Sequence, residues 1–78
     1  MVYLHFINLF IVLMTGTVKF FNASKGYGFI TNDETGKDTF VHVTRLNGLE
    51  LTEGDKVEYT EGEGRDGRPI ALEVSIIG

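Results

Sequence analysis

Residues Lys25-Gly26-Tyr27-Gly28-Phe29-Ile30 carry two aromatic rings two positions apart, each preceded by a glycine. Successive side chains of a β-strand point to opposite faces, so Tyr27 and Phe29 share one face, while Gly28 and Ile30 share the other. A strand that buries one face would send its large rings inward together with Ile30. Because Ile30 lies opposite the rings, one face of this strand must be a surface with exposed aromatic side chains. Nearby lysines give that surface the character of a stacking platform for nucleic-acid bases.

The sequence from Met14 onward predicts five short strands separated by polar or glycine-containing turns. Ten glycines, one proline and many β-branched residues favour strands over helices. Five antiparallel strands without a strong helix signal predict an all-β fold, a small barrel that leaves no exposed sheet edge. Leucines in the connection 46–51 are expected to plug one end of the barrel. The predicted strands are residues 15–22, 26–32, 38–44, 55–60 and 69–77, with loops at 33–37 and 61–67.

Alternation within these strands predicts which side chains face the core. In the first strand Val18 faces inward, and the adjacent Phe20 and Phe21 cannot share a face unless a bulge or strong twist intervenes. The inward positions expected in the later strands are Thr39, Val41 and Val43, then Val57 and Tyr59, and finally Ile70, Leu72, Val74 and Ile76.

Aromatic side chains from three predicted strands fall on the outward face. The second strand provides Tyr27 and Phe29, the third provides Phe40 and His42, and Phe20 extends the patch from the first. An aromatic cluster in a small β domain is usually core, but here isoleucine and valine side chains occupy the inner face by alternation. Rings exposed in this way offer bases a π surface on which to stack.

A few cations are placed to assist such binding. Lys19 and Lys25 flank the rings and are expected to meet phosphates, which positions a strand without reading its sequence. Arg68, beside Pro69, is expected to reach the edge of the ligand. The other cations considered are predicted to be ordinary solvated charges, namely Lys37, Lys56 and Arg65.

Length and composition restrict the alternatives. A chain of 78 residues has room for one small domain. The absence of cysteine excludes disulfides and thiolate metal sites, and it is compatible with a reducing cytoplasm. Seven basic and eleven acidic residues give a net charge of −4, which argues against a general polycation. It leaves room for a binder whose few cations gather on one face.

No catalytic or cofactor-binding constellation is present in the sequence. There is no phosphate-binding Gly-x-x-x-x-Gly-Lys-Ser/Thr loop, no cluster of metal ligands and no cysteine nucleophile. The histidines are His5 and His42, and the pattern places no acid or base beside His42. We therefore expect no enzyme activity, no metal, no cofactor and no small-molecule substrate.

Several segments together resemble the bacterial cold shock domain. Three of them match it in order and spacing, and a fourth resembles its entry to the fourth strand: Val18–Asn22, Lys25–Ile30, Asp38–Val43 and Leu51–Val57. The resemblance extends from Met14 to about Ile77. It implies a five-stranded oligonucleotide-binding (OB-fold) barrel that binds single-stranded RNA and DNA, often as an RNA chaperone or antiterminator, and we expect a cytoplasmic monomer. Carried over position by position, it implies ligand contacts at Lys19, Phe20, Lys25, Tyr27, Phe29, Asp38, Phe40 and His42.

The sequence departs from the usual family pattern at the expected platform. The family usually has tryptophan where Phe20 stands and often phenylalanine where Val43 stands. The stretch 44–53 is shorter than usual and lacks the aromatic residue commonly found there. Fewer and smaller rings stack fewer bases, so we expect weaker binding than from a complete platform.

The first thirteen residues, MVYLHFINLFIVL, contain no Asp, Glu, Lys or Arg and contrast sharply with the rest. At roughly 20 residues per membrane-spanning helix, the segment is too short to span a bilayer. The remaining interpretations are a membrane-associating tail, a segment packed on the barrel, or a mis-set start with translation beginning at Met14, which we favour. We therefore divide the chain into a leader, 1–13, and a cold shock domain, 14–78. The alternatives to nucleic-acid binding are a protein-interaction barrel and a membrane-tethered variant.

Overall fold

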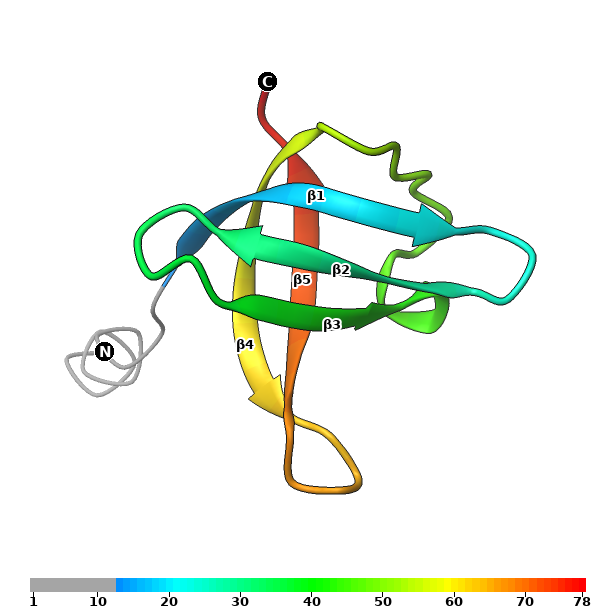
Figure 1. Ribbon diagram of the computed structural model, residues 1–78. Helices are drawn as coiled ribbons and strands as arrows, with labels where there is room; N and C mark the ends of the chain where they lie inside the picture. Colours follow the sequence, from blue (N-terminus) through cyan, green and yellow to red (C-terminus); the bar gives the residue numbers. More distant parts are fainter. Residues whose placement is uncertain (1–12) are drawn as a thin grey trace, which may run out of the picture.

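The computed structural model describes residues 13–78, which form a closed five-stranded β-barrel (Figure 1). The all-β barrel predicted from the sequence is therefore confirmed. Its strand order is β1-β2-β3-β5-β4, and a single 3₁₀ turn, η1, follows β3. The elements are β1 (Met14–Asn22), β2 (Tyr27–Asn32), β3 (Asp38–His42), η1 (Val43–Arg45), β4 (Lys56–Glu63) and β5 (Pro69–Ile76).

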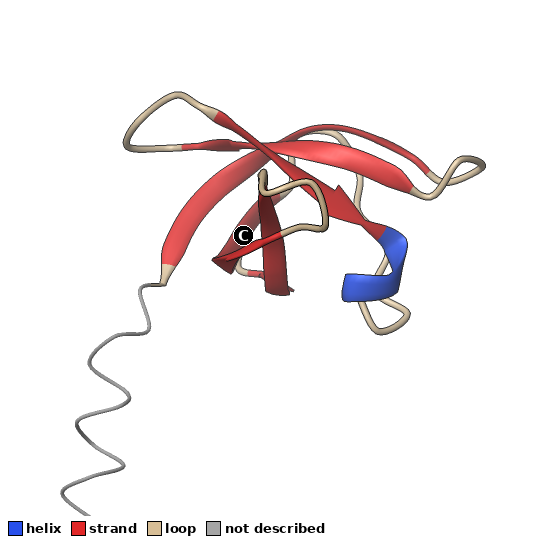
Figure 2. Cartoon of the chain, turned by 90° about the horizontal axis from the view of Figure 1, so that it is seen from below, coloured by secondary structure: helices blue, strands red, loops and turns tan. Residues whose placement is uncertain are grey.

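The barrel consists of a layer formed by β1, β2 and β3, crossed by the β4–β5 hairpin (Figures 1 and 2). Neighbouring strands pair antiparallel except at the closure, where β3 meets β5 in parallel through Phe40 and Ile70. The prediction of a wholly antiparallel barrel is thus wrong at this one pair. The exception arises because β5 reaches β3 after pairing with β4, whose direction fixes that of β5.

A β-bulge in β1 determines which faces of the sheet two adjacent phenylalanines occupy. Val18 pairs with Ile30 and Phe20 pairs with Phe29, so Lys19 is an extra residue on β1. Such an insertion puts two successive side chains on the same side of the sheet. Lys19 and Phe20 consequently lie outside, while Phe21 turns inward and packs against the core. The irregularity predicted near the phenylalanine pair is confirmed.

A second bulge lies in β5 and overturns its predicted inner face. Between the pairs Glu58–Ser75 and Thr60–Leu72, β5 contains one more residue than β4, and Glu73 there has a φ of 52°. The bulge shifts the alternation by one residue, so that Ala71 and Val74 become the buried positions. The expected single inward row of Ile70, Leu72, Val74 and Ile76 is wrong, and Ile76 is 41% exposed.

The third strand ends two residues earlier than predicted. The amide N–H of Thr44 donates to Nδ1 of His42, which caps the 3₁₀ turn that begins at Val43. This turn takes Val43 out of the strand alternation and leaves it 44% exposed, so its predicted inward position is wrong. The predicted loop 61–67 is also wrong in its first part, because β4 continues to Glu63.

The core consists of aliphatic side chains and one tyrosine, Tyr59, inside the barrel. Leu46 and Leu51, from the connection between η1 and β4, are buried as expected for residues that close a barrel end. The buried cluster contains Val18, Ile30, Val41, Leu46, Leu51, Val57, Tyr59, Ala71 and Val74.

Gly28 permits the close approach of β1 and β2 beneath the aromatic rings. A Cβ atom at this position would collide with the carbonyl oxygen of Phe20 and would lie 2.8 Å from Cα of Phe21. These two atoms are backbone and cannot move aside as a flexible side chain would, and Cδ1 of the Phe21 ring would also lie 2.8 Å away. In Tyr27-Gly28-Phe29, the two rings therefore point outward. Gly28, which has no side chain, allows the backbone of β1 to approach β2 closely on the inner face.

We expect Gly28→Ala to destabilise the fold by about 3 kcal/mol, the upper part of the usual range for overpacking, because backbone must shift. Gly36→Ala is the matched control, since its Cβ would meet nothing within 4 Å and only its φ of 75° is unfavourable. That control should lose about 1–2 kcal/mol. Urea unfolding of both variants measures the difference, and a smaller loss for Gly28→Ala than for Gly36→Ala would contradict this account.

Candidate nucleic-acid interface

Strand pairing brings five ring-bearing side chains together on the outer face of β1–β3. Tyr27 pairs with His42, Phe29 pairs with Phe40, and Phe20 pairs with Phe29 from the other side. Directly paired residues of neighbouring strands project to the same face. We call the surface formed by Phe20, Tyr27, Phe29, Phe40 and His42 the aromatic face.

The rings of the aromatic face contact one another in a continuous cluster. The ring centroids of Phe20 and Phe29 are 5.6 Å apart, and those of Tyr27 and Phe40 are 5.8 Å apart with planes inclined by only 23°. Phe40 also lies 6.4 Å from His42. Phe20 is 38% exposed, and the other phenylalanines and the tyrosine are half-buried by their neighbours. The rings thus support one another and still present surface to solvent.

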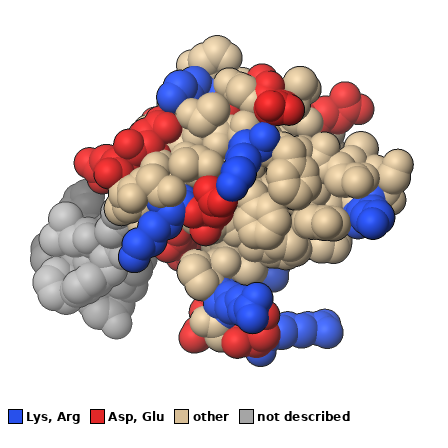
Figure 3. Space-filling view, viewed as in Figure 1, with Lys and Arg blue, Asp and Glu red and all other residues tan. Residues whose placement is uncertain are grey.

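The opposite face of the same strands explains why the rings lie outside. Ile30 and Val41 have no exposed surface, and Thr39 is 2% exposed. Thr39 also donates its hydroxyl to Glu61, at 2.9 Å between the oxygens. The interior is filled by these side chains, so the aromatic cluster is a surface feature. Figure 3 shows this face as a broad uncharged area bordered by basic and acidic side chains.

Two contacts with Thr44 orient the His42 ring. Its Nδ1 atom accepts the amide N–H of Thr44 at 3.3 Å and lies 3.0 Å from the Thr44 hydroxyl. A neutral imidazole that accepts at Nδ1 carries its proton on Nε2. With Nδ1 turned toward Thr44, His42 offers its ring for stacking and its Nε2 atom for a ligand contact.

Lys19 and Asp38, both predicted site residues, form an ion pair beside the aromatic face. The Lys19 ammonium lies 2.9 Å from one carboxylate oxygen of Asp38, and the Thr31 hydroxyl donates to the other at 2.8 Å. The hydrogen bond from Lys19, followed by that from Thr31, lowers the pKa of Asp38 below its ordinary value. The pair is exposed. The carboxylate of Asp38 partly offsets the positive charge of Lys19, the residue expected from the sequence to contact phosphates.

Lys25 and Arg68 border the aromatic face from different turns. Lys25 belongs to the β1–β2 turn, where its amide N–H donates to the Asn22 side chain at 2.9 Å, and its own side chain is exposed. Arg68, from the β4–β5 hairpin, pairs with Asp66 at 3.5 Å. The structure thus brings all nine predicted site residues to one face or its margin.

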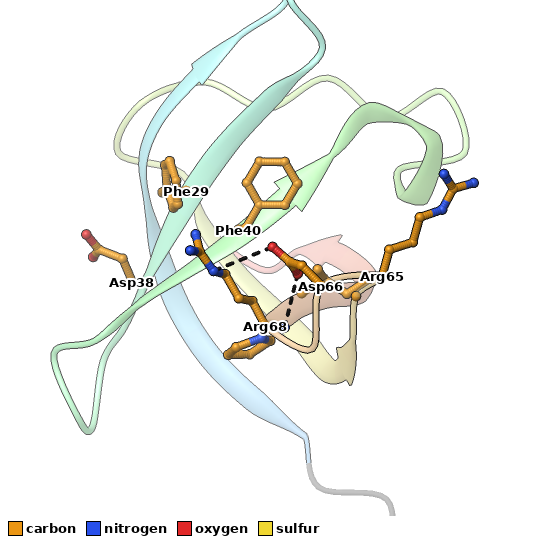
Figure 4. Close-up of a pocket in the computed structure, with 9 residues that line it drawn as sticks. Phe29, Asp38, Phe40, Arg65, Asp66 and Arg68 are labelled. Atoms are coloured by element: carbon orange, nitrogen blue, oxygen red, sulfur yellow. Dashed lines mark hydrogen bonds and ion pairs between the residues drawn. The ribbon is translucent and has the colours of Figure 1, made fainter.

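Arg68 stands at a cleft of about 620 Å³ between the aromatic face and the β4–β5 hairpin (Figure 4). Phe29 and Phe40 form one wall of this cleft, and Pro69 lies on the hairpin side. The sequence did not predict that the hairpin contributes to this cleft, because residues 61–67 are typical of a charged loop. The one available signal was Arg68 beside Pro69. The cleft is lined by Phe29, Asp38, Phe40, Gly64, Arg65, Asp66, Arg68, Pro69 and Ile70.

The described part of the chain offers no metal site. Across residues 13–78 there is no group of three or more His, Cys, Asp or Glu side chains placed to hold an ion. Over the same residues, no helix is long and apolar enough to cross a membrane. Residues 1–13 of the predicted leader lie outside the described residues except for Leu13, so the interpretations of that segment stay predictions.

Comparison with known proteins identifies related chains over most of this length. The family model described as the 'Cold-shock' DNA-binding domain matches residues 14–77. The Cold shock-like protein CspG of Escherichia coli strain K12 is 47% identical over 66 residues, which are 81% of this chain and 94% of that protein. The Cold shock-like protein CspA of Vibrio cholerae is 43% identical over 67 residues, with 82% and 94% covered.

The same domain occurs inside longer eukaryotic proteins. Glycine-rich protein 2 of Nicotiana sylvestris is 48% identical over 63 residues, which are 77% of this chain but only 29% of that protein. The bacterial relatives, in contrast, are matched over nearly their whole length.

Proposed function

The chain belongs to the cold-shock domain family of nucleic-acid-binding proteins, and we propose that it binds single-stranded RNA and DNA on its aromatic face. The observation that carries this proposal is the continuous cluster of partly exposed rings on β1–β3. Bases in a duplex are already stacked and paired, so this surface is suited to unpaired bases. Stacking of this kind tolerates any sequence because every base has a π face.

Charged groups around the rings support a strand without dominating its binding. Lys25 has no carboxylate within ion-pair distance among residues 13–78, whereas Lys19 and Arg68 each share their charge with an aspartate. A phosphate that approaches Lys19 competes with Asp38 for the ammonium group. We infer that base stacking supplies most of the affinity and that phosphate contacts supply a smaller part.

On this mode of binding, we propose that the protein acts as an RNA chaperone or antiterminator in the cytoplasm. A base held on the aromatic face is withdrawn from pairing, so an abundant binder shifts hairpins toward the single-stranded state by mass action. The process needs no ATP, no cofactor and no catalytic residue.

Replacing Phe29 or Phe40 by alanine should weaken binding to a pyrimidine-rich single strand by about 1–3 kcal/mol for each ring removed. Fluorescence anisotropy with a labelled oligonucleotide at fixed salt measures the change in Kd. Ile77→Ala is the matched control, because Ile77 is an apolar residue that is 49% exposed outside the aromatic face.

Circular dichroism and the thermal midpoint establish that each variant retains its fold. Folded Phe29→Ala and Phe40→Ala proteins that bind as tightly as wild type would refute the proposed site. If the protein binds no single strand but captures a protein partner through the same rings, the protein-interaction alternative is correct.

A larger ring at position 20 of the aromatic face should strengthen binding of a single strand. Phe20→Trp adds ring area at an edge that is already 38% exposed, so the larger side chain has room and more surface for stacking. We expect several-fold tighter binding of the same oligonucleotide. Unchanged or weaker binding by a folded Phe20→Trp variant would mean that the size of this ring does not limit affinity.

A further inference from the structure

A groove leads from Phe40 and His42 of the aromatic face past η1, and beyond these two rings its surface has no role in the proposed stacking. The 620 Å³ cleft shares Phe40, Gly64, Arg65 and Ile70 with a second cleft of about 700 Å³. The second cleft in turn shares Thr44 and Arg45 with a third, of about 400 Å³. We call the second cleft the side groove; it is lined by Phe40, His42, Thr44, Arg45, Glu63, Gly64, Arg65 and Ile70.

Two arginines form opposite walls of the side groove. Arg45 is the last residue of η1, and Arg65 belongs to the turn between β4 and β5, which projects beyond the β1–β3 layer (Figure 1). Figure 4 shows Arg65 extending away from Arg68 and Asp66, on the other side of the hairpin turn. The rings of Phe40 and His42 stand at the entrance from the aromatic face.

Both arginines have their charge available. Each is exposed, and within residues 13–78 no carboxylate lies at ion-pair distance from either. Lys19, Lys56 and Arg68, in contrast, are all paired with aspartates. In a chain with net charge −4, two free guanidinium groups facing one groove mark a site for negative charge.

The one acidic residue in the side groove does not neutralise this pair. A Cβ atom at Gly67 would lie 3.8 Å from Oε2 of Glu63, so the carboxylate lies over the hairpin turn. The Glu63 carboxylate is beyond ion-pair distance from Arg45 and Arg65.

We propose that a single strand bound on the aromatic face continues into the side groove, where Arg45 and Arg65 bind its phosphates. This inference rests on the proposed function and extends it: the strand is held by stacking on β1–β3 and by charge between η1 and the hairpin. Guanidinium groups are strong donors to phosphate oxygens, and beyond Phe40 and His42 the groove offers no further ring for stacking. The groove therefore binds the backbone and does not read bases.

The inference predicts that Arg45 and Arg65 act only on strands long enough to pass beyond the rings. The short strand is a labelled oligothymidylate of about four nucleotides, which is the lower limit of the site size for such barrels. The long strand is a labelled oligothymidylate of about ten nucleotides, which extends past that limit. Arg45→Ala and Arg65→Ala should each weaken binding of the longer strand several-fold and leave the shorter strand unchanged. Each should also reduce the slope of log K against log salt by about 0.7, the value for one phosphate contact to a single strand.

Lys37→Ala is the matched control, since Lys37 is an exposed cation of the β2–β3 loop that lines none of the three clefts. It removes one charge from the full chain and should leave the slope for both strands unchanged. Arg45→Lys and Arg65→Lys keep the charge and should keep most of the slope.

The outcomes separate this inference from the proposed function. If both strands bind and Phe29→Ala weakens both, but the arginine variants match Lys37→Ala, the side groove is refuted and the aromatic face stands. Equal weakening of the short and long strands by the arginine variants also refutes it, because the effect is then one of general charge. If wild type binds neither strand, the proposed function fails and the inference fails with it.

Discussion

The close approach of β1 and β2 at Gly28 is the constraint on which the rest of the structure depends. No side-chain atom fits between Gly28 and the backbone of Phe20 and Phe21, so the main chain of β1 and the inward Phe21 ring close the interior at this point. Ile30 and Val41 fill the adjoining space and have no exposed surface. The large rings on the same strands have no interior volume left to occupy. The exposed aromatic face is therefore a consequence of how the core is packed.

The arrangement of charge follows the same division between the faces. The carboxylate of Asp38 pairs with the ammonium of Lys19 beside the aromatic face, so the charge of this cation is already partly offset. A chain with net charge −4 cannot rely on general attraction to phosphate. Affinity must come from stacking and from the few cations that remain free near the ligand, Lys25 at one margin and the two arginines of the side groove at another. Such a protein should be less sensitive to salt than a strongly basic binder.

Local alternation predicted the aromatic face because Gly28 and Ile30 left no doubt about the inner side of β2. It failed where long-range pairing or a specific hydrogen bond intervened. The bulge at Glu73 places a glutamate at positive φ, which residue type does not suggest, and the cap of η1 by His42 removes Val43 from its strand. The side groove could not be predicted, because Arg45 and Arg65 are twenty positions apart and line one groove only through the closure of β3 on β5.

The central claim is that one face of the barrel, built on β1–β3, binds a single strand while the acidic stretch Glu53–Glu58 does not. Amide chemical shifts of the ¹⁵N-labelled full chain, titrated with an oligothymidylate, test this claim residue by residue. The account predicts concerted changes at Lys19–Phe20, Tyr27–Phe29 and Phe40–His42, with little change in the acidic stretch Glu53–Glu58. Changes centred on Glu53–Glu58, with the amides of the aromatic face unaffected, would contradict it.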